Sequence, residues 1–547
     1  MKRRFVLQLL AMVTAISSVT FLSSCDDDND PEGAAPAVSI NPTSATDKPG
    51  AVVTVTVSVT APNGGKTLQI SGIDADDVTL NGSNQQDVEV DITIPADASA
   101  GSTVTAVFIA IDKTDKASTP VEFPITVGDP LEILEGNITT NTSLDASKKY
   151  LIRGKVYVQA PATLTIPAGT ILFGEKDSDG TLIINRGAKI DAQGTADNPI
   201  IMTSQAPKGF RNRGDWGGVV ILGNAYNSNG ASATIEGIQG EAGSENGAYG
   251  PGTGDANDAD DSGIMRYVRI EFAGIALSQD NELNSLTMGS VGSGTTIDHI
   301  QVSYANDDAF EWFGGSVNHK YLIAYSTLDD DFDTDRGYNG KTQFGLIVRD
   351  PLQADFSGSR AWESSSNGNA TPSTVGGTSR HSAPVFSNVT VCGPLLFRGS
   401  ASINQFFRSG IEVNSNSAIQ IHNSVITGFP KAATFATAGA TVTNNIFVAN
   451  LSNAADGASA PGDFGSDNTL EDDVTKIFGA FTAGSLYSFE NAPLTQTTDS
   501  PYLTGATDLG DDFFDNVPFY GAFGTEAAAE WDFDKGWINF DPANEAY

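Results

Sequence analysis

The sequence predicts an all-β protein in which a small sandwich precedes a right-handed parallel β-helix. Two observations predict the β-helix: short β runs alternate with glycine from residue 131 onward, and the segment 296–336 matches itself at a shift of 22 residues. A third observation predicts the sandwich, because residues 38–128 form short, regularly spaced runs that alternate apolar and polar side chains. A repeat of about 20 to 30 residues with one β phase per copy is typical of solenoids, whose coils stack on one another.

The acidic composition limits the classes of molecule that the protein is expected to bind. The chain has 547 residues with 67 acidic and 30 basic side chains, which gives a net charge of −37. Such acidity argues against nucleic acid and anionic lipid, and it suits a secreted, calcium-rich setting. The two cysteines, Cys25 and Cys392, are not predicted to pair, because Cys25 has another use and Cys392 lies in an apolar run typical of an inert core thiol.

Residues 1–24 are a predicted signal peptide, because a basic start precedes an apolar run that is too short to span a membrane. Leu22-Ser23-Ser24-Cys25 resembles a bacterial lipobox, in which the cysteine is acylated. The acidic run 26–30 is similar to the surface-export signal of Bacteroidota lipoproteins. The resemblance implies an outer-membrane protein, lipid-anchored through Cys25 and facing the cell exterior.

The next two segments are predicted to be a tether and a spacer. Residues 25–37 are an acidic, Pro/Gly/Ala-containing linker, and residues 38–128 are expected to form an Ig-like β-sandwich. We find no constellation of histidine, cysteine or paired acids in the sandwich. A spacer that lifts the following domain off the membrane needs none.

Residues 131–451 are the predicted β-helix, interrupted by loops at 224–263 and 354–383. Repeated asparagines before strands predict a hydrogen-bonded ladder at one corner; they are Asn388, Asn423 and Asn444. After Leu451 the repeats fade, and the aromatic side chains of 452–547 are expected to cap the open end of the core.

Acidic side chains gather at one corner of the predicted β-helix. Under the shift of 22, Asp307 falls on Asp329, Asp308 on Asp330 and Glu311 on Asp333. Paired residues on neighbouring strands lie about 4.8 Å apart, so these carboxylates repel one another unless a cation lies between them. Ca²⁺ takes six to eight oxygen ligands. We therefore predict a calcium site with the candidate ligands Asp307, Asp308, Glu311, Asp329, Asp330, Asp331, Asp333 and Asp335. The acidic tail of the first loop, 255–261, is a second candidate.

Long phrases from residue 131 to the end resemble a family of β-helix surface lipoproteins of Bacteroidota and related bacteria, which have a pectate-lyase-like fold. The phrases are RGDWGGVVILGNA at 213–225, MRYVRIEFAG at 265–274, GSGTTIDHIQVSYANDDAFEWFGGSVN at 292–318, KYLIAYSTLDDDFDTDRGYNGKTQFGLIVRDP at 320–351, and FYGAFG with GWINFDP near the end. The resemblance implies a surface or secreted β-helix and carries over no activity.

Enzymes of this fold resemble the chain at three short motifs. Ile297-Asp298-His299 is similar to the WIDH motif of pectate lyases without its tryptophan. Arg349-Asp350-Pro351 is similar to the start of their Arg-x-Pro-x-x-Arg signature, whose last arginine would fall on Ala354. Asn306-Asp307-Asp308 is similar to the acid pair of polygalacturonases, without the His-Gly and Arg-x-Lys motifs that accompany it.

These motifs define the catalytic candidates. A calcium-dependent lyase would use Arg349 or Arg336 as its base, and a glycosidase would use Asp308 with Asp330 or Glu311. The candidate ligand-binding residues beside the acids are Trp312, Tyr338 and Arg336.

Two functions are consistent with the sequence. The leading hypothesis is a non-catalytic surface protein that binds glycan or another extracellular ligand on a calcium-stabilised β-helix, with polysaccharide and an outer-membrane transporter complex as candidate partners. The alternative is a calcium-dependent polysaccharide lyase or glycoside hydrolase that acts on a uronate-containing polysaccharide. Release of reducing or unsaturated ends would distinguish the enzyme from the binding protein.

Overall fold

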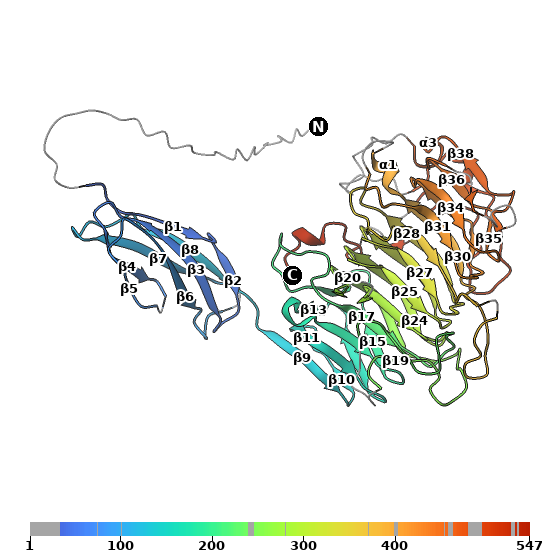
Figure 1. Ribbon diagram of the computed structural model, residues 1–547, viewed down its shortest axis with the longest axis horizontal. Helices are drawn as coiled ribbons and strands as arrows, with labels where there is room; N and C mark the ends of the chain where they lie inside the picture. The colour runs from blue at the N-terminus through green and yellow to red at the C-terminus, as the bar shows by residue number, and fades with distance from the viewer. Residues whose placement is uncertain are drawn as a thin grey trace, which may run out of the picture. The chain divides into compact units, whose positions relative to one another are not determined.

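The structure is a computed structural model that describes residues 33–547 except 74, 100, 239–244, 279–280, 370, 399–402, 453–454, 458–462, 480–494, 527–530 and 533–534. Cys25 and its lipobox lie outside the described residues. The chain divides into two compact units between Asp129 and Pro130, which is where the sequence pattern changes (Figure 1). Among the described residues, no helix is long and apolar enough to cross a bilayer.

The first unit is a β-sandwich of two sheets. One sheet is antiparallel and contains β1 (Ala37–Asn41), β3 (Val52–Thr60) and β6 (Gln85–Thr93). The other sheet has the order β2 (Ala45–Asp47), β8 (Val121–Val127), β7 (Thr103–Asp112), β4 (Gly65–Ser71) and β5 (Val78–Thr79). Alternate side chains of β3 and β7, such as Val57 and Phe108, are buried in a common apolar core. The Ig-like assignment of this sandwich stays a prediction.

The second unit contains a parallel β-helix, in which 26 strands of the described residues join in one sheet. Its strands are β9 (Leu131–Ile138), β10 (Thr142–Ser143), β11 (Lys149–Val158), β12 (Thr163–Pro167), β13 (Ile171–Gly174), β14 (Thr181–Ile184), β15 (Lys189–Gln193), β16 (Ile200–Ser204), β17 (Gly218–Leu222), β20 (Gly263–Glu271), β23 (Leu286–Gly289), β24 (Thr296–Ser303), β25 (Phe310–Phe313), β26 (Asn318–Tyr325), β27 (Phe332–Asp335), β28 (Lys341–Val348), β29 (Trp362–Ser364), β30 (Val385–Cys392), β31 (Ser409–Val413), β32 (Gln420–His422), β33 (Val425–Thr427), β34 (Lys431–Phe435), β35 (Thr441–Thr443), β36 (Ile446–Val448), β37 (Ala455–Asp456) and β38 (Thr469–Glu471).

Smaller elements lie between and after these strands. They are the antiparallel pairs β18 (Ala233–Thr234) with β19 (Ala248–Tyr249) and β21 (Ala276–Ser278) with β22 (Asn281–Glu282), the short helices α1 (Pro394–Arg398) and α3 (Thr475–Phe478), and the 3₁₀ turns η1 (Lys176–Ser178), η4 (Pro501–Leu503) and η5 (Pro542–Asn544).

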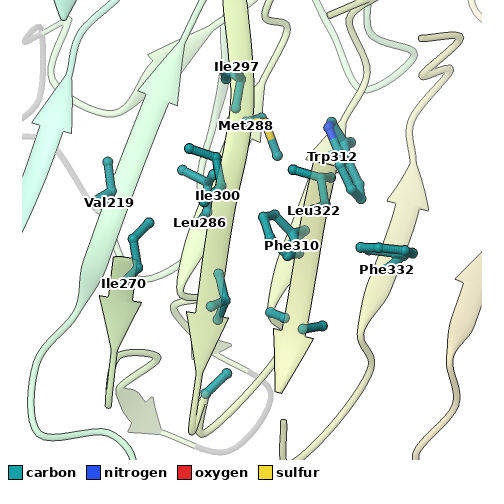
Figure 2. Packing of buried hydrophobic residues seen from close by; sticks show 14 of the residues in the cluster. Val219, Ile270, Leu286, Met288, Ile297, Ile300, Phe310, Trp312, Leu322 and Phe332 are labelled. Atoms are coloured by element: carbon teal, nitrogen blue, oxygen red, sulfur yellow. The ribbon is translucent and has the colours of Figure 1, made fainter. Parts of the chain in front are cut away.

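The predicted 22-residue register is confirmed in the middle of the β-helix. Phe310 pairs with Phe332, and Glu311 pairs with Asp333. Inward side chains from successive coils fill the core between the strands (Figure 2). The rings of Phe310 and Phe332 lie 5.6 Å apart between centroids, and Trp362 follows at 6.0 Å from Phe332. Gly345 allows close packing beside this column, because a Cβ there would lie 3.1 Å from both methyl groups of Val389.

One corner of the β-helix is formed by residues with a left-handed backbone. In each of five coils, one residue at this position is left out of the strand pairing and has φ between +50° and +64°. These residues are Tyr267, His299, Tyr321, Phe344 and Asn388. Bulky residues rarely adopt this conformation, and here ring stacking compensates, since His299 stacks 4.2 Å from Tyr267 and 4.3 Å from Tyr321.

The expected asparagine ladder forms in part along the same corner. Asn444 donates from Nδ2 to Oδ1 of Asn423 at 2.9 Å. Asn388 does not continue the ladder, because its Oδ1 accepts from Gln343 at 3.1 Å and its Nδ2 donates to the carbonyl of Phe519.

Two predicted boundaries are corrected by the structure. The loop predicted at 354–383 contains β29, which pairs with β27 and β31 and completes a coil. The β-helix also continues past Leu451, because β38 pairs with β36. Both errors involve strands of two or three residues among polar side chains, which are too short to produce a detectable period.

The described residues of 495–547, called here the C-terminal strap, lie along the flank of the β-helix. This corrects the prediction that their aromatic side chains cap the open end of the core. The amide of Gly521 donates to the carbonyl of Asn423 at 2.7 Å, and the amide of Trp537 donates to Ala196 at 3.0 Å, so the strap passes many coils. It covers outward apolar side chains of β26 and β28, such as Ile323 and Leu346, which a sequence pattern cannot distinguish from core positions.

Side-chain amides of the flank hold the strap through its backbone. Gln301 donates to the carbonyl of Asn539 at 2.6 Å and accepts from its amide at 2.8 Å. Gln343 makes the same reciprocal pair with Asp515, at 2.8 Å in both directions. These contacts satisfy buried polar groups on both partners, so the strap is part of the folded domain.

Trp537→Ala should therefore destabilise the β-helix. The side chain is fully buried and packs edge-on against His299 at 5.2 Å, so truncation should cost about 3–5 kcal/mol, measured by urea unfolding. Phe210→Ala is the matched control, because Phe210 is 72% exposed and its loss should change stability by less than about 0.5 kcal/mol. Equal behaviour of the two variants would contradict the docking of the strap.

Candidate functional site

A pocket of about 350 Å³ lies where the chain turns before β25, β27 and β29. Ten of its fourteen lining residues are acidic. The lining residues are Glu236, Glu282, Asn306, Asp307, Asp308, Glu311, Leu328, Asp329, Asp330, Asp333, Asp355, Phe356, Ser357 and Glu363.

Strand alternation and coil stacking position these acids. Along β25, Phe310 and Trp312 enter the core, so Glu311 between them faces the pocket. The parallel register then places Glu311 beside Asp333 and Asp333 beside Glu363. Glu412 on β31 continues the row, which is called here the carboxylate ladder.

Six of the predicted acids come together in the pocket. Oxygens of Asp307, Asp308 and Asp329 lie within 4.8 Å of one another, and so do oxygens of Asp308, Glu311 and Asp333. Asp308 belongs to both groups, and its Oδ1 also accepts from the amide of the sixth acid, Asp330, at 2.8 Å.

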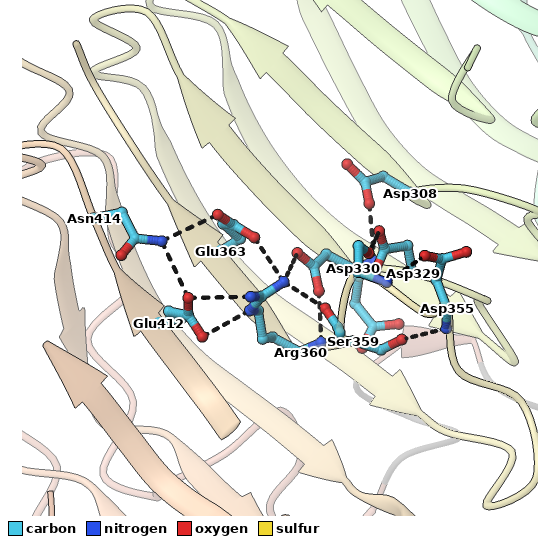
Figure 3. A network of polar contacts seen from close by, with 12 residues as sticks. Asp308, Asp329, Asp330, Asp355, Ser359, Arg360, Glu363, Glu412 and Asn414 are labelled. Carbon is cyan, nitrogen blue, oxygen red and sulfur yellow. Dashed lines mark hydrogen bonds and ion pairs between the residues drawn. The ribbon is translucent and has the colours of Figure 1, made fainter. Parts of the chain in front are cut away.

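Arg360 neutralises the opposite end of the ladder (Figure 3). Its guanidinium lies 2.8 Å from Glu363, 2.9 Å from Glu412 and 3.6 Å from Asp330. Asn414 donates to both glutamates and holds them in place. Arg360 is therefore a built-in counter-ion for one half of the ladder.

The other half has no such counter-ion. Within the part of the chain that the structure describes, no ion pair involves Asp307, Asp308, Glu311 or Asp333; Arg360 pairs with Asp330, Glu363 and Glu412 instead. Oδ1 of Asp333, like Oδ1 of Asp329, is buried and accepts no hydrogen bond from a described residue. Such oxygens are costly to bury unless a cation or a hydrogen-bond donor reaches them.

Burial raises the pKa of every acid at this end. The pKa of Asp308 rises well above its usual value because of burial and then the charge of Asp307, and the pKa of Glu311 rises because of burial and then Asp333. Burial likewise raises the pKa of Asp329 to about 7. Removal from water and mutual repulsion both disfavour the charged form, so these carboxyl groups hold protons more readily than free carboxyl groups do.

Two of the predicted calcium ligands lie elsewhere. Asp331 is fully buried and pairs with Arg349 at 3.1 Å, and Asp335 pairs with Arg336 at 3.1 Å. Neither lines the pocket. The structure therefore does not bring Asp331 and Asp335 into the pocket with the other six acids, and each has an arginine as its partner.

The catalytic and ligand-binding predictions also need correction. Arg349 is buried, donates to the carbonyls of Leu328 and Asp329, and has no access to a substrate. Arg336 is bound to Asp335 outside the pocket. Neither arginine lines the pocket, so the structure does not bring the predicted bases to the acids, and Arg336 is not placed to bind a ligand there.

Trp312 and Tyr338 are core residues. Their rings stack 5.3 Å apart and neither is exposed. Trp312 donates to His319 at 2.9 Å, and the Tyr338 hydroxyl donates to the carbonyl of Val317 at 2.8 Å. The prediction that they bind ligand is wrong, since the alternation that turns Glu311 outward turns Trp312 inward.

The acidic loop at 255–261 is not a second cation site. Asp258 forms an ion pair with Arg380, and Asp261 forms one with Lys189. Asp260 accepts from the side chain of Asn224 at 3.0 Å. These acids have protein partners and tie the loop to the β-helix.

Sequence reasoning missed Glu363, Arg360 and Phe356 because it placed them in a loop. A signal was present: Trp362-Glu363 repeats the aromatic–acid pair of Phe310-Glu311 and Phe332-Asp333. This pair lies 30 residues after Phe332-Asp333, so a search at a shift of 22 does not find it.

A family model described as pectate-lyase like beta helix domain matches residues 136–467. The chain belongs to this family. No curated protein matches the chain. Membership agrees with the parallel β-helix of β9 to β38. The enzyme-like motifs fit less well, because His299 stacks between tyrosines beneath Trp537 and Arg349 is buried in an ion pair.

The raised pKa values predict that the metal-free protein loses stability as pH rises. A carboxyl whose folded pKa exceeds its unfolded value binds more protons in the folded state, so its contribution falls through the window from about pH 4 to pH 7. We expect the melting temperature in EDTA to fall by several degrees between pH 5 and pH 8. Acids with a lowered pKa, such as Glu471 at about 2, act below this window and do not offset the fall. A flat or rising profile would contradict the prediction.

Proposed function

We propose that this protein is a surface lipoprotein that binds Ca²⁺ in the acidic pocket and uses the occupied pocket to bind a glycan without cleaving it. The observation that carries the proposal is the cluster of six carboxylates brought together by the coil register, with Arg360 at one end only. A divalent ion at the other end would remove the repulsion that the fold creates.

The geometry of the cluster supports Ca²⁺. Opposite ligands of an ion that binds oxygen at about 2.4 Å lie about 4.8 Å apart. Both groups of three acids meet this limit, and Asp308 belongs to both. Carboxylates of Asp307, Asp308, Glu311, Asp329 and Asp333 would supply the protein ligands, and Asp330 would support Asp308 through its backbone amide.

A non-catalytic role is supported by the positions of the two arginines that the sequence suggested as bases. Arg349 and Arg336 are occupied by Asp331 and Asp335, which leaves a lyase without the base that the sequence suggested. The enzymatic alternative is favoured by one observation, that several pocket acids have raised pKa values and so could act as general acids. Release of reducing or unsaturated ends from polygalacturonate would favour that alternative.

Calcium should stabilise the protein, and EDTA should lower its melting temperature. A ligand at a hundredfold over its dissociation constant adds about 2.7 kcal/mol to the free energy of unfolding. Asp308→Asn should reduce the calcium-induced shift most, because Asp308 is shared by both groups of acids. Asp258→Asn, which alters an ion pair with Arg380 outside the pocket, should keep the full shift. A melting temperature indifferent to calcium and EDTA would overturn the calcium site.

The lipid anchor is proposed from the lipobox and the acidic run that follows it. Cys25→Ala should move the protein from the membrane fraction to a soluble fraction, because acyl chains supply the only proposed contact with the bilayer. Protease accessibility on intact cells should fall in parallel if the chain faces the exterior. Unchanged surface labelling of the variant would show that the anchor lies elsewhere. An outer-membrane transporter complex remains the proposed partner at this location.

A further inference from the structure

Phe356 presents an exposed aromatic ring beside the acidic pocket. The side chain lines the pocket and is 61% exposed. Its neighbours are fixed on both sides: the amide of Asp355 donates to the carbonyl of Leu328 at 3.2 Å, and the hydroxyl of Ser357 donates to Asp329 at 2.9 Å. The residues on both sides of Phe356 are thus hydrogen-bonded to the site. An aromatic face beside convergent polar groups is typical of a small-molecule site.

The wall of the pocket is rich in hydrogen-bond acceptors. An ionised carboxylate only accepts hydrogen bonds, and Oδ1 atoms of Asp329 and Asp333 are buried without a donor. A ligand that supplies hydrogen-bond donors would complement this wall. Sugar hydroxyls can donate, whereas the carboxylate group of a uronate at neutral pH has no proton to give.

Charge argues against an acidic ligand. One divalent ion and Arg360 supply three positive charges against eight lining acids, with Glu236 and Glu282 left out of the count, so negative charge stays in excess. The net charge of −37 repels polyanions from the molecule as a whole. A uronate polymer would thus meet repulsion both on approach and in the pocket.

Resting on the proposed function, we infer that the ligand is a neutral glycan that lies over Phe356 and whose adjacent hydroxyls complete the coordination of the bound ion and donate to Asp329 and Asp333. The volume of about 350 Å³ is at the lower end of ligand pockets, so a short stretch of the glycan enters it. This assignment separates the protein from enzymes that require an acidic polysaccharide.

Affinity gel electrophoresis of the soluble Cys25→Ala chain in millimolar Ca²⁺ tests the inference. The probes are neutral galactomannan and arabinogalactan, acidic polygalacturonate and alginate, and cationic chitosan. We expect retardation by a neutral polymer and none by the acidic polymers. Phe356→Ala should weaken binding about tenfold, equivalent to about 1.4 kcal/mol. Phe210→Ala, which removes a more exposed phenylalanine that does not line the pocket, should leave binding within about twofold.

The outcomes distinguish the inference from the function on which it rests. Retardation by polygalacturonate or alginate, with neutral polymers inactive, would overturn the neutral-glycan assignment while glycan binding survived. Preferential retardation by chitosan in EDTA would assign the pocket to an ammonium group instead. Equal binding by Phe356→Ala and the parent chain would remove the ring from the site. A calcium-dependent melting temperature with no retardation by any polymer would leave the ion site intact and overturn both glycan claims.

Discussion

Parallel pairing of successive coils is the constraint on which both the core and the acidic pocket depend. The register that stacks Phe332 on Phe310 also places Asp333 beside Glu311. Burial of one large aromatic side chain contributes about 3–5 kcal/mol, as judged from truncation. Two like charges about 4.8 Å apart cost about 3.5 kcal/mol at an effective dielectric constant of 20. The two effects are of similar size, so the stacked core holds the acids together but leaves a repulsion large enough to require a counter-charge.

The negative charge is neutralised differently at the two ends of the carboxylate ladder. Arg360 lies among Asp330, Glu363 and Glu412, and Asn414 orients the two glutamates. The positive charge of Arg360 is permanent, because a guanidinium stays charged at any physiological pH. At the other end the acids respond to their surroundings, either by binding protons or by binding a cation. That end would therefore make stability depend on pH and, under the proposed function, on calcium.

The sequence was informative where a short period was repeated without interruption. The shift of 22 identified six acids that do come together, because strand alternation and parallel stacking convert sequence intervals directly into distances. The same alternation could have excluded Trp312, which is two positions from the inward Phe310. Glu363 was not predicted, because it follows its strand partner Asp333 by 30 residues, whereas the repeat that was recognised has 22.

Other errors could not have been avoided from the pattern alone. Outward apolar residues such as Ile323 and Leu346 look like core residues until the C-terminal strap is seen to cover them. The partner that neutralises Asp331 is Arg349, which lies in a different coil segment and had suggested catalysis by its motif. Long-range packing decides such cases, and a single sequence contains no measure of it.

Some residues of the pocket lie on paired strands and others lie on loops. These two groups could contribute differently to ligand specificity. Glu311 and Asp333 are fixed by strand pairing, so the position of the proposed cation would follow from the core. Asp355 and Phe356 lie on the connection between β28 and β29, which can change without altering any strand pair. Changes in the ladder would disturb packing and charge together, whereas changes in the connection would alter the residues at the mouth of the pocket. Ligand preference in such a site is therefore expected to vary through the loop, with the ladder held constant by the physical demands of the β-helix.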